Sequence, residues 1–197
     1  MNYHVVTYTG PFGFIKPWTA VRDEITYSQQ FLTPSIVEGM EKKLFPELLN
    51  KQGIHRILRH RLAYRGLSEQ MELIQAADYK LKSIKGEKHF KRASRKTSRL
   101  FRSVLLQPML HLAFDNVMDA LTASKQHLCL CRNEDLIYPI RQRTFTIDAF
   151  EKLEGFELRF GQEHNGAFLV GYNRFDAAAP MYGALQIVGN ASQYETV

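Results

Sequence analysis

Residues 80–102 read KLKSIKGEKHFKRASRKTSRLFR, and no other part of the chain has a comparable composition. The stretch holds ten Lys or Arg residues, one acid (Glu87) and few large apolar side chains. Such a segment cannot bury enough apolar surface to order itself independently. We expect it to project from a folded body as a hairpin or a mobile loop.

The excess of cations extends upstream of this stretch. Residues 51–102 hold fifteen Lys or Arg against four acids, a net charge of +11, whereas the whole chain is only +6. Concentrated like charges repel one another unless a polyanion or counter-ions neutralise them. Nucleic acid is the favoured partner, and an anionic membrane surface is the alternative.

The overall composition is that of one folded domain. Of the 197 residues, 45% are apolar and 23% are charged, which is ordinary for a globular protein. No apolar run is long enough to span a bilayer, and the first residues show no signal-peptide pattern. We expect a cytoplasmic protein.

The N-terminal half predicts a strand, a turn and a helix in that order. Residues 3–9 are β-branched and aromatic, and a glycine turn follows at residues 10–13. Thr33 and Pro34 are typical of a helix start. Residues 54–65 fit either a basic amphipathic helix or a broken pair of strands, and residues 68–79 fit either a helix or a strand.

The C-terminal half indicates mostly sheet. Residues 103–114 form an apolar run in which Pro108 indicates an edge or a bulge, and residues 117–123 fit a short helix. Residues 156–160 alternate strictly, and the Asn165–Gly166 pair predicts a hairpin with residues 167–172. The polar residues 189–197 are expected to fray.

The residue types in the basic region suit single-stranded or structured RNA. Cations hold phosphates and flat side chains stack on bases, and no signature of a duplex-DNA-binding motif is present. A metal-independent endoribonuclease is the competing reading, because it needs only a general acid, a general base and a cation. The chemically eligible groups are His55, His60, Tyr64, Lys88 and His89.

A metal site is not expected. His127, Cys129 and Cys131 alternate on one predicted strand, which gives three ligands at a spacing narrower than zinc sites use. The two cysteines are also poorly placed for a disulfide with each other. We predict neither a metal nor a cofactor.

Three segments resemble the CRISPR-associated Cas-five family. They are YTGPFGFIKP at residues 8–17, FLTPSIVEGM at residues 31–40, and RLFRSVLL at residues 99–106. The resemblance implies a RAMP-type α+β protein with a ferredoxin-like (RRM-like) antiparallel sheet, packed helices and an inserted basic thumb. It predicts a single domain over residues 1–197, with residues 80–102 as the thumb.

Proteins similar to this one are non-catalytic, guide-RNA-binding subunits of Cascade-like ribonucleoprotein complexes in antiviral defence. The resemblance implies that the chain holds the five-prime handle of crRNA, caps the backbone filament, and meets backbone and large subunits, with target DNA reached through the complex. Processing of precursor crRNA by the chain itself is the alternative. The predicted RNA-binding residues are Lys16, Trp18, Arg22, Arg56, Arg59, Arg61, Arg65, Lys85, Lys88, His89, Phe90, Lys91, Arg92, Arg95, Lys96, Arg99 and Arg102.

Overall fold

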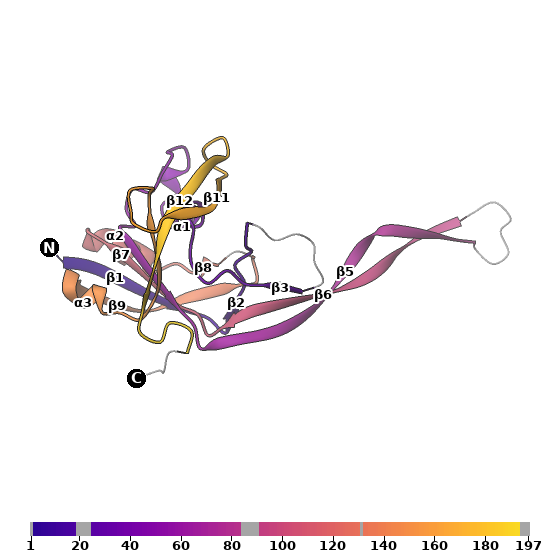
Figure 1. Ribbon diagram of the computed structural model, residues 1–197, viewed down its shortest axis with the longest axis horizontal. Helices are drawn as coiled ribbons and strands as arrows, with labels where there is room; N and C mark the ends of the chain where they lie inside the picture. Colours follow the sequence, from indigo (N-terminus) through magenta and orange to yellow (C-terminus); the bar gives the residue numbers. More distant parts are fainter. Residues whose placement is uncertain (1, 19–24, 84–90, 131, 194–197) are drawn as a thin grey trace.

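The chain forms a body of sheet and helices from which a long two-stranded arm projects (Figure 1). The computed structural model describes residues 2–18, 25–83, 91–130 and 132–193. For residues 76–83 and 91–95 only the course of the backbone is described. The α+β class predicted from the sequence is confirmed, since strands dominate and three α-helices accompany them in the described residues.

The elements follow one another with short connections. They are β1 (Asn2–Thr9), β2 (Phe12–Gly13), β3 (Ile25–Tyr27), α1 (Pro34–Leu44), the 3-10 turn η1 (Pro46–Leu48), β4 (Arg59–Ala63), β5 (Gly66–Ser83), β6 (Lys91–Leu106), β7 (Met109–Phe114), α2 (Val117–Ala123), β8 (Leu128–Cys129), β9 (Leu136–Thr146), α3 (Ile147–Glu151), β10 (Gly155–Phe160), β11 (Phe168–Asn173) and β12 (Ala179–Val188).

The main sheet has the strand order β11-β12-β10-β4-β7-β1-β9-β8, and its neighbouring strands pair antiparallel. A second sheet has the order β2-β6-β3, and β5 pairs with β6 to form the arm. The arm is therefore inserted in sequence between β4 and β7, two strands that pair with each other in the middle of the main sheet.

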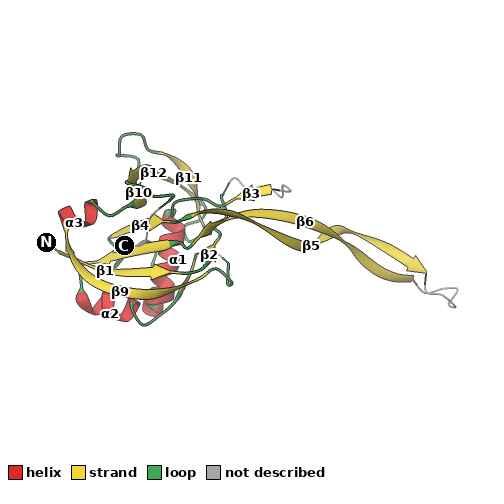
Figure 2. Ribbon diagram, turned by 90° about the horizontal axis from the view of Figure 1, so that it is seen from below, coloured by secondary structure: helices red, strands yellow, loops and turns green. Residues whose placement is uncertain are grey.

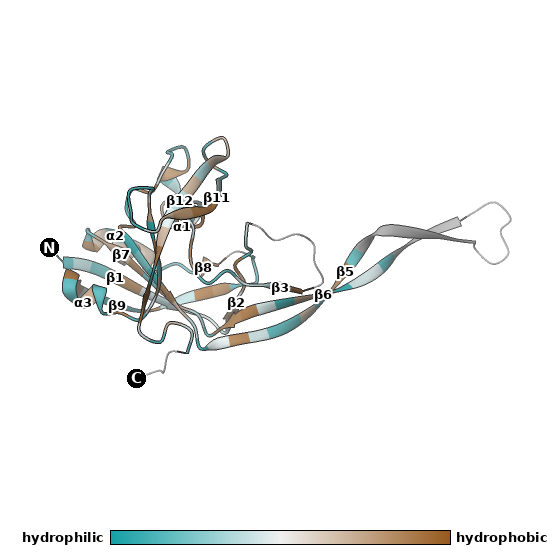
Figure 3. Cartoon of the chain, viewed as in Figure 1, coloured by the Kyte–Doolittle hydropathy of each residue, from teal (hydrophilic) through white to brown (hydrophobic). Residues whose placement is uncertain are grey.

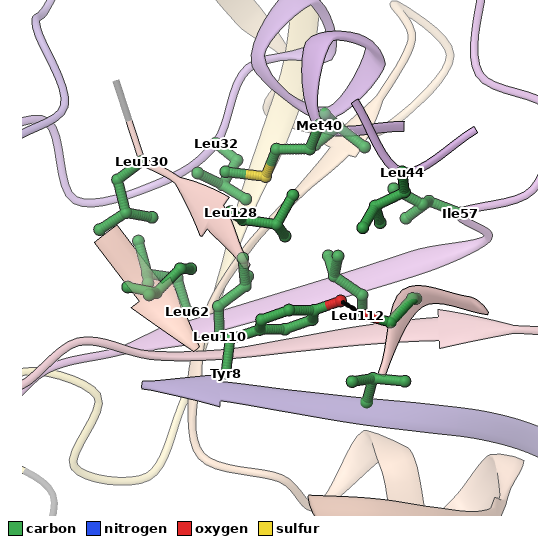
Figure 4. Packing of buried hydrophobic residues seen from close by; sticks show 14 of the residues in the cluster. Tyr8, Leu32, Met40, Leu44, Ile57, Leu62, Leu110, Leu112, Leu128 and Leu130 are labelled. Carbon is green, nitrogen blue, oxygen red and sulfur yellow. Dashed lines mark hydrogen bonds between the residues drawn. The ribbon is translucent and has the colours of Figure 1, made fainter. Parts of the chain in front are cut away.

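Helices α1 and α2 cover one face of the main sheet, which we call the first face. Tyr8 of β1 and Leu112 of β7 pack there in one cluster with Met40 and Leu44 of α1 (Figure 4), and Val6 of β1 belongs to the same cluster. Tyr8 also donates a hydrogen bond to the carbonyl of Ala123 at the end of α2, at 2.7 Å. Apolar burial of this kind is the main favourable term in folding, so the first face holds the larger core.

The opposite face, which we call the second face, carries a smaller apolar cluster at one end. Tyr3 and Val5 alternate with Val6 and Tyr8 along β1, so they point to this side. Phe150 of α3 packs edge-on against Tyr3, with ring centroids 5.4 Å apart. Helix α3 thus covers only the end of the second face that lies near the start of β1.

Several local predictions are confirmed. The strand at residues 3–9, the helix beginning at Pro34 and the helix at residues 117–123 are all present. The two ambiguous segments are extended: β4 occupies part of residues 54–65, and β5 covers residues 68–79. Pro108 lies at a corner between β6 and β7, so residues 103–114 form parts of two strands rather than one.

The predicted hairpin between residues 156–160 and 167–172 is wrong. Both segments are strands, but β12 lies between them and pairs with β10 on one side and β11 on the other. Alternation identified the strands correctly, whereas pairing was decided by a third strand further along the chain. Fraying of the tail is also wrong for Ala191, which is 3% exposed and accepts a hydrogen bond from the backbone N–H of Tyr64.

Candidate nucleic-acid interface

The arm is a long antiparallel pair of strands. Its register runs from Gly66 opposite Leu106 to Ser83 opposite Lys91, with an irregularity between Gln75 and Tyr79. At about 3.3 Å per residue, β5 extends for roughly 50–60 Å, and most of that length stands clear of the body (Figures 1 and 2). Of the projection predicted for residues 80–102, the structure describes residues 80–83 and 91–102, which lie on β5 and β6 of the arm, and the paired region is longer than predicted because it begins at Gly66 and ends at Leu106.

The far half of the arm is rich in cations and sets one of them directly opposite another. The register places Lys82 opposite Arg92, and the next pairs are Ser83 with Lys91 and Leu81 with Ala93. Like charges directly opposite in a sheet are destabilising, and an isolated two-stranded hairpin is only marginally stable in water. A polyanion that neutralises these charges would therefore stabilise this part of the arm.

The half of the arm nearer the body has an apolar face. Met71 and Leu73 of β5 are 53% and 67% exposed, and Ile25 and Tyr27 of the adjoining β3 are 50% and 64% exposed. Register places Ile25 and Met71 on either side of Phe101, so these side chains share one face. Figure 3 shows hydrophobic bands at this level of the arm. Contiguous exposed apolar residues mark an interaction surface.

An ionic cluster fastens the arm to the body. Arg102 on β6 donates to Glu72 on β5 at 3.0 Å, and Arg132 on the loop before β9 donates to the same carboxylate. Arg132 also donates twice to the buried Asp135, at 2.7 Å each. Both guanidinium groups lie about 5 Å from the ring centre of Phe14. Arg102 was predicted to contact RNA, but it is 20% exposed and its charge is already paired.

Arg59 and Arg61 are buried and do not belong to an RNA surface. They are 9% and 0% exposed, and both donate to Glu157, which is itself 1% exposed (Arg59 Nη2 at 2.8 Å and Arg61 Nη2 at 3.0 Å). Burial alone would raise the pKa of Glu157, but the hydrogen bonds and charge of Arg59 outweigh it and hold that pKa below its ordinary value. The sequence showed these cations without showing that carboxylates about a hundred residues away neutralise them.

Arg56 and Arg65 lie on the body rather than on the arm. Arg56 is paired with Glu47 and Asp119, at 2.8 and 3.0 Å. Arg65, at the base of the arm, is exposed and donates to the side-chain oxygen of Gln107. Of these two predicted RNA contacts, only Arg65 presents an exposed cation close to the arm.

Lys16 and Trp18 lie together away from the arm tip. Both are exposed, and Trp18 packs edge-on against Tyr172 of β11 with ring centroids 5.7 Å apart. The close approach of Trp18 to β11 occurs at Gly171, whose φ is +138°. A Cβ at that position would be strained and would contact the indole, so glycine permits the pairing.

The remaining predicted RNA-binding residues belong to the arm or fall outside the described residues. Arg22, Lys85, Lys88, His89 and Phe90 lie outside them. Lys91, Arg92 and Arg95 are placed by their backbone on β6, and the side chains of Lys96 and Arg99 are exposed there. The structure thus brings together on one hairpin the described cations from Lys80 to Arg99.

The groups eligible for acid–base catalysis do not converge in the described part of the chain. His60 is buried and stacked on Phe160, and burial lowers its pKa to about 4. Tyr64 is 2% exposed, stacks on Phe156, and has a pKa raised by burial. His55 is exposed and its Nε2 lies 2.9 Å from the carbonyl oxygen of Gln52.

Other chemistry is sparse in the described residues. No group of three or more His, Cys, Asp or Glu side chains there is arranged to hold a metal ion, and Cys131 of the predicted His-x-Cys-x-Cys pattern lies outside them. Within the same residues, no helix is both long and apolar enough to cross a bilayer. Comparison with models of protein families and with curated protein sequences finds no match.

Proposed function

We propose that this chain is a non-catalytic guide-RNA-binding subunit of a CRISPR Cascade-like complex, and that the arm is the part that grips RNA. The observation that carries the proposal is the register of the far half of the arm, where Lys82 stands opposite Arg92 at the end of a hairpin that projects into solvent. That arrangement is unfavourable in isolation and favourable around a phosphate backbone.

Single-stranded RNA fits the arm better than a membrane surface. An anionic bilayer neutralises one flat face, whereas cations at several levels of a narrow two-stranded arm can follow a strand that crosses or wraps around it. The resemblance of residues 8–17 and 31–40 to the Cas-five family supplies the identity of the RNA, which would be the five-prime handle of crRNA.

The body supports a ferredoxin-like assignment. The elements β1, α1, β4, β7, α2 and β9 follow one another as β-α-β-β-α-β once the arm is set aside, and their strands lie in the order β4-β7-β1-β9. Both helices pack on the first face. This is the arrangement that a RAMP-type protein would have, with the arm in the place of the thumb.

Protein partners fit the apolar half of the arm. Met71, Leu73, Ile25 and Tyr27 expose about half or more of their surface on a face that nothing in the described chain covers. In a Cascade-like assembly, backbone or large subunits would cover it while the far half of the arm holds RNA. Target DNA would be reached through the complex as a whole.

Salt-dependent RNA binding tests the proposal. The triple variant Lys82→Gln, Arg92→Gln, Arg99→Gln removes three arm cations, and Lys51→Gln, Lys125→Gln, Lys152→Gln removes three exposed cations from the body. Each phosphate contact contributes about 0.7 to the slope of log affinity against log salt for single strands, so the arm variant should lose roughly 2 units of slope. The control should lose much less.

Binding assays also test which RNA the protein prefers and whether it cleaves RNA. Wild-type protein should prefer repeat-derived RNA over unrelated RNA of equal length, and RNA retained by co-purified complexes should be rich in guide sequences. Equal slopes for the arm variant and the control would contradict the role of the arm. A discrete cut product formed from repeat RNA in the presence of chelator would favour the endoribonuclease reading instead.

A further inference from the structure

Two arginines on β9, the strand of the main sheet that lies between β1 and the short edge strand β8, are exposed and carry no partner among the described residues. They are Arg141 and Arg143. The other described arginines of the body each contact a carboxylate, an amide oxygen or an aromatic ring. The pair thus differs from the cations that stabilise the fold.

Register places both arginines on the second face. Arg141 stands opposite Thr7 and Arg143 opposite Val5, and directly opposed residues of an antiparallel pair share a face. Thr7 is hydrogen-bonded to His111 of β7, at 2.9 Å, on the same side. Residues two apart on a strand are about 6.6 Å from each other, so the two guanidinium groups can follow successive groups of an extended ligand.

An aromatic side chain continues the row. Tyr138 stands opposite Thr9, also on the second face, and is 51% exposed. The ring of the exposed His127 lies 6.0 Å from the ring of Tyr138. We call His127, Tyr138, Arg141 and Arg143 the β9 strip. Helix α3 packs on the second face near the start of β1 (Figure 2), and the four residues of the strip are exposed in the described structure.

We propose that the β9 strip is a second contact site for single-stranded RNA, separate from the arm, with Arg141 and Arg143 on consecutive phosphates and Tyr138 under a base. The inference rests on the proposed function, because it concerns the same class of ligand. Cations that track a backbone beside aromatic rings form the usual platform for single strands. A carboxylate ligand would match the arginines but would leave the exposed ring of Tyr138 without a partner.

The experiment compares six proteins by fluorescence anisotropy over a range of salt. These are the wild type, the strip variant Arg141→Gln, Arg143→Gln, the control Lys51→Gln, Lys125→Gln, the triple arm variant described above, and the single variants Tyr138→Ala and Tyr138→Phe. The control lysines are exposed and follow η1 and α2, on the side of the first face. The probe is a labelled single-stranded RNA longer than roughly 16 nucleotides, so that it can reach beyond one site.

The strip variant should lose about 1.4 units of salt slope relative to wild type, and the control should keep the wild-type slope. Tyr138→Ala should weaken binding by roughly fivefold or more, whereas Tyr138→Phe, which keeps the flat ring, should bind as wild type does. Thermal unfolding of every variant is measured in parallel, so that a loss of fold is not counted as a loss of binding.

The outcomes separate this inference from the proposed function. If the arm variant loses slope and the strip variant does not, the strip is overturned and the arm stands. If the strip variant retains RNA but loses a co-purifying protein, the strip is a protein contact and the inference is likewise overturned. If wild-type protein binds no RNA, both proposals fail.

Discussion

Replacing Glu157 by glutamine tests whether the buried ionic cluster supports the fold. The carboxylate of Glu157 lies between Arg59 and Arg61 and is almost wholly buried. Glutamine keeps the size of the side chain and removes its charge. The two arginines would then share only Glu151, which is 39% exposed.

The expected loss follows from breaking a buried ion pair on one side. Such changes cost about 3–5 kcal/mol, because a charge is left in the interior without its counter-charge. For a domain of this size the total free energy of unfolding is about 5–15 kcal/mol, so the variant should be conspicuously unstable. In urea titrations followed by circular dichroism, the midpoint should fall by roughly 1–2 M.

Glu154→Gln is the matched control, since Glu154 is exposed and lies three residues upstream of Glu157. A difference of less than about 1 kcal/mol between the two variants would refute the reasoning. If Glu157→Gln does not fold, the triple replacement Arg59→Met, Arg61→Leu, Glu157→Leu offers a second measurement. Apolar replacement of a whole buried cluster is often neutral or stabilising, so that protein should fold again.

The other two predictions concern acid stability and the attachment of the arm. Burial holds the pKa of His60 at about 4, against 6.5 for the ordinary side chain, because desolvation disfavours its charged form. Unfolding exposes a group that takes up a proton, so the contribution of His60 to stability should fall by roughly 3 kcal/mol as pH drops from 6.5 to 4. Burial also lowers the pKa of His111 to about 4, so His60→Phe should reduce the fall of the urea midpoint across that range without abolishing it, and an unchanged pH profile would contradict the assignment. Glu72→Gln should remove the carboxylate that links Arg102 on the arm to Arg132 on the body, while Arg132 keeps its pairing with Asp135. Amide hydrogen exchange in residues 66–75 should then speed up, with a cost to the body of no more than about 1 kcal/mol because the cluster is partly exposed. Glu69→Gln, an exposed change on the same strand, should leave exchange there as in wild type.

Local chemistry was enough to predict the elements that depend on their own residues. The helix beginning at Pro34 follows from a residue suited to the first helical position, and the projecting arm follows from a charge density that no compact core accepts. Alternation located β10 and β11 as strands. Each of these features is determined by residues that lie close together in the sequence.

The errors arose where a distant residue decides the outcome. The segment containing Arg59 and Arg61 looked amphipathic and basic, but Glu157 turns these cations inward and makes the segment a buried strand. The loop that precedes this strand is likewise held by Glu41 of α1, whose buried carboxylate accepts hydrogen bonds from the backbone N–H groups of His55 and Ile57. Nothing in the spacing of a single segment indicates such long-range pairings.

The candidate site shows the same division. The count of charged residues located the arm. It could not show that carboxylates pair with Arg56 and Arg102, which makes these two arginines less available to RNA. Sequence analysis missed Arg141 and Arg143 because two cations on a strand are common in composition. Only the register shows that they share a face, and no described residue there neutralises them.

The arm leaves the body through two neighbouring strands in the middle of the sheet, and a hydrogen bond from the backbone N–H of Arg65 to the carbonyl of Leu106 closes its root. A pulling force on the arm would therefore act on β4 and β7, which lie in the middle of the main sheet. Each of these strands is also paired with a further neighbour, β10 or β1, so the force is shared among several strands and does not fall on a single edge strand. The proposed binding of RNA by the arm would then leave the strands that anchor it paired.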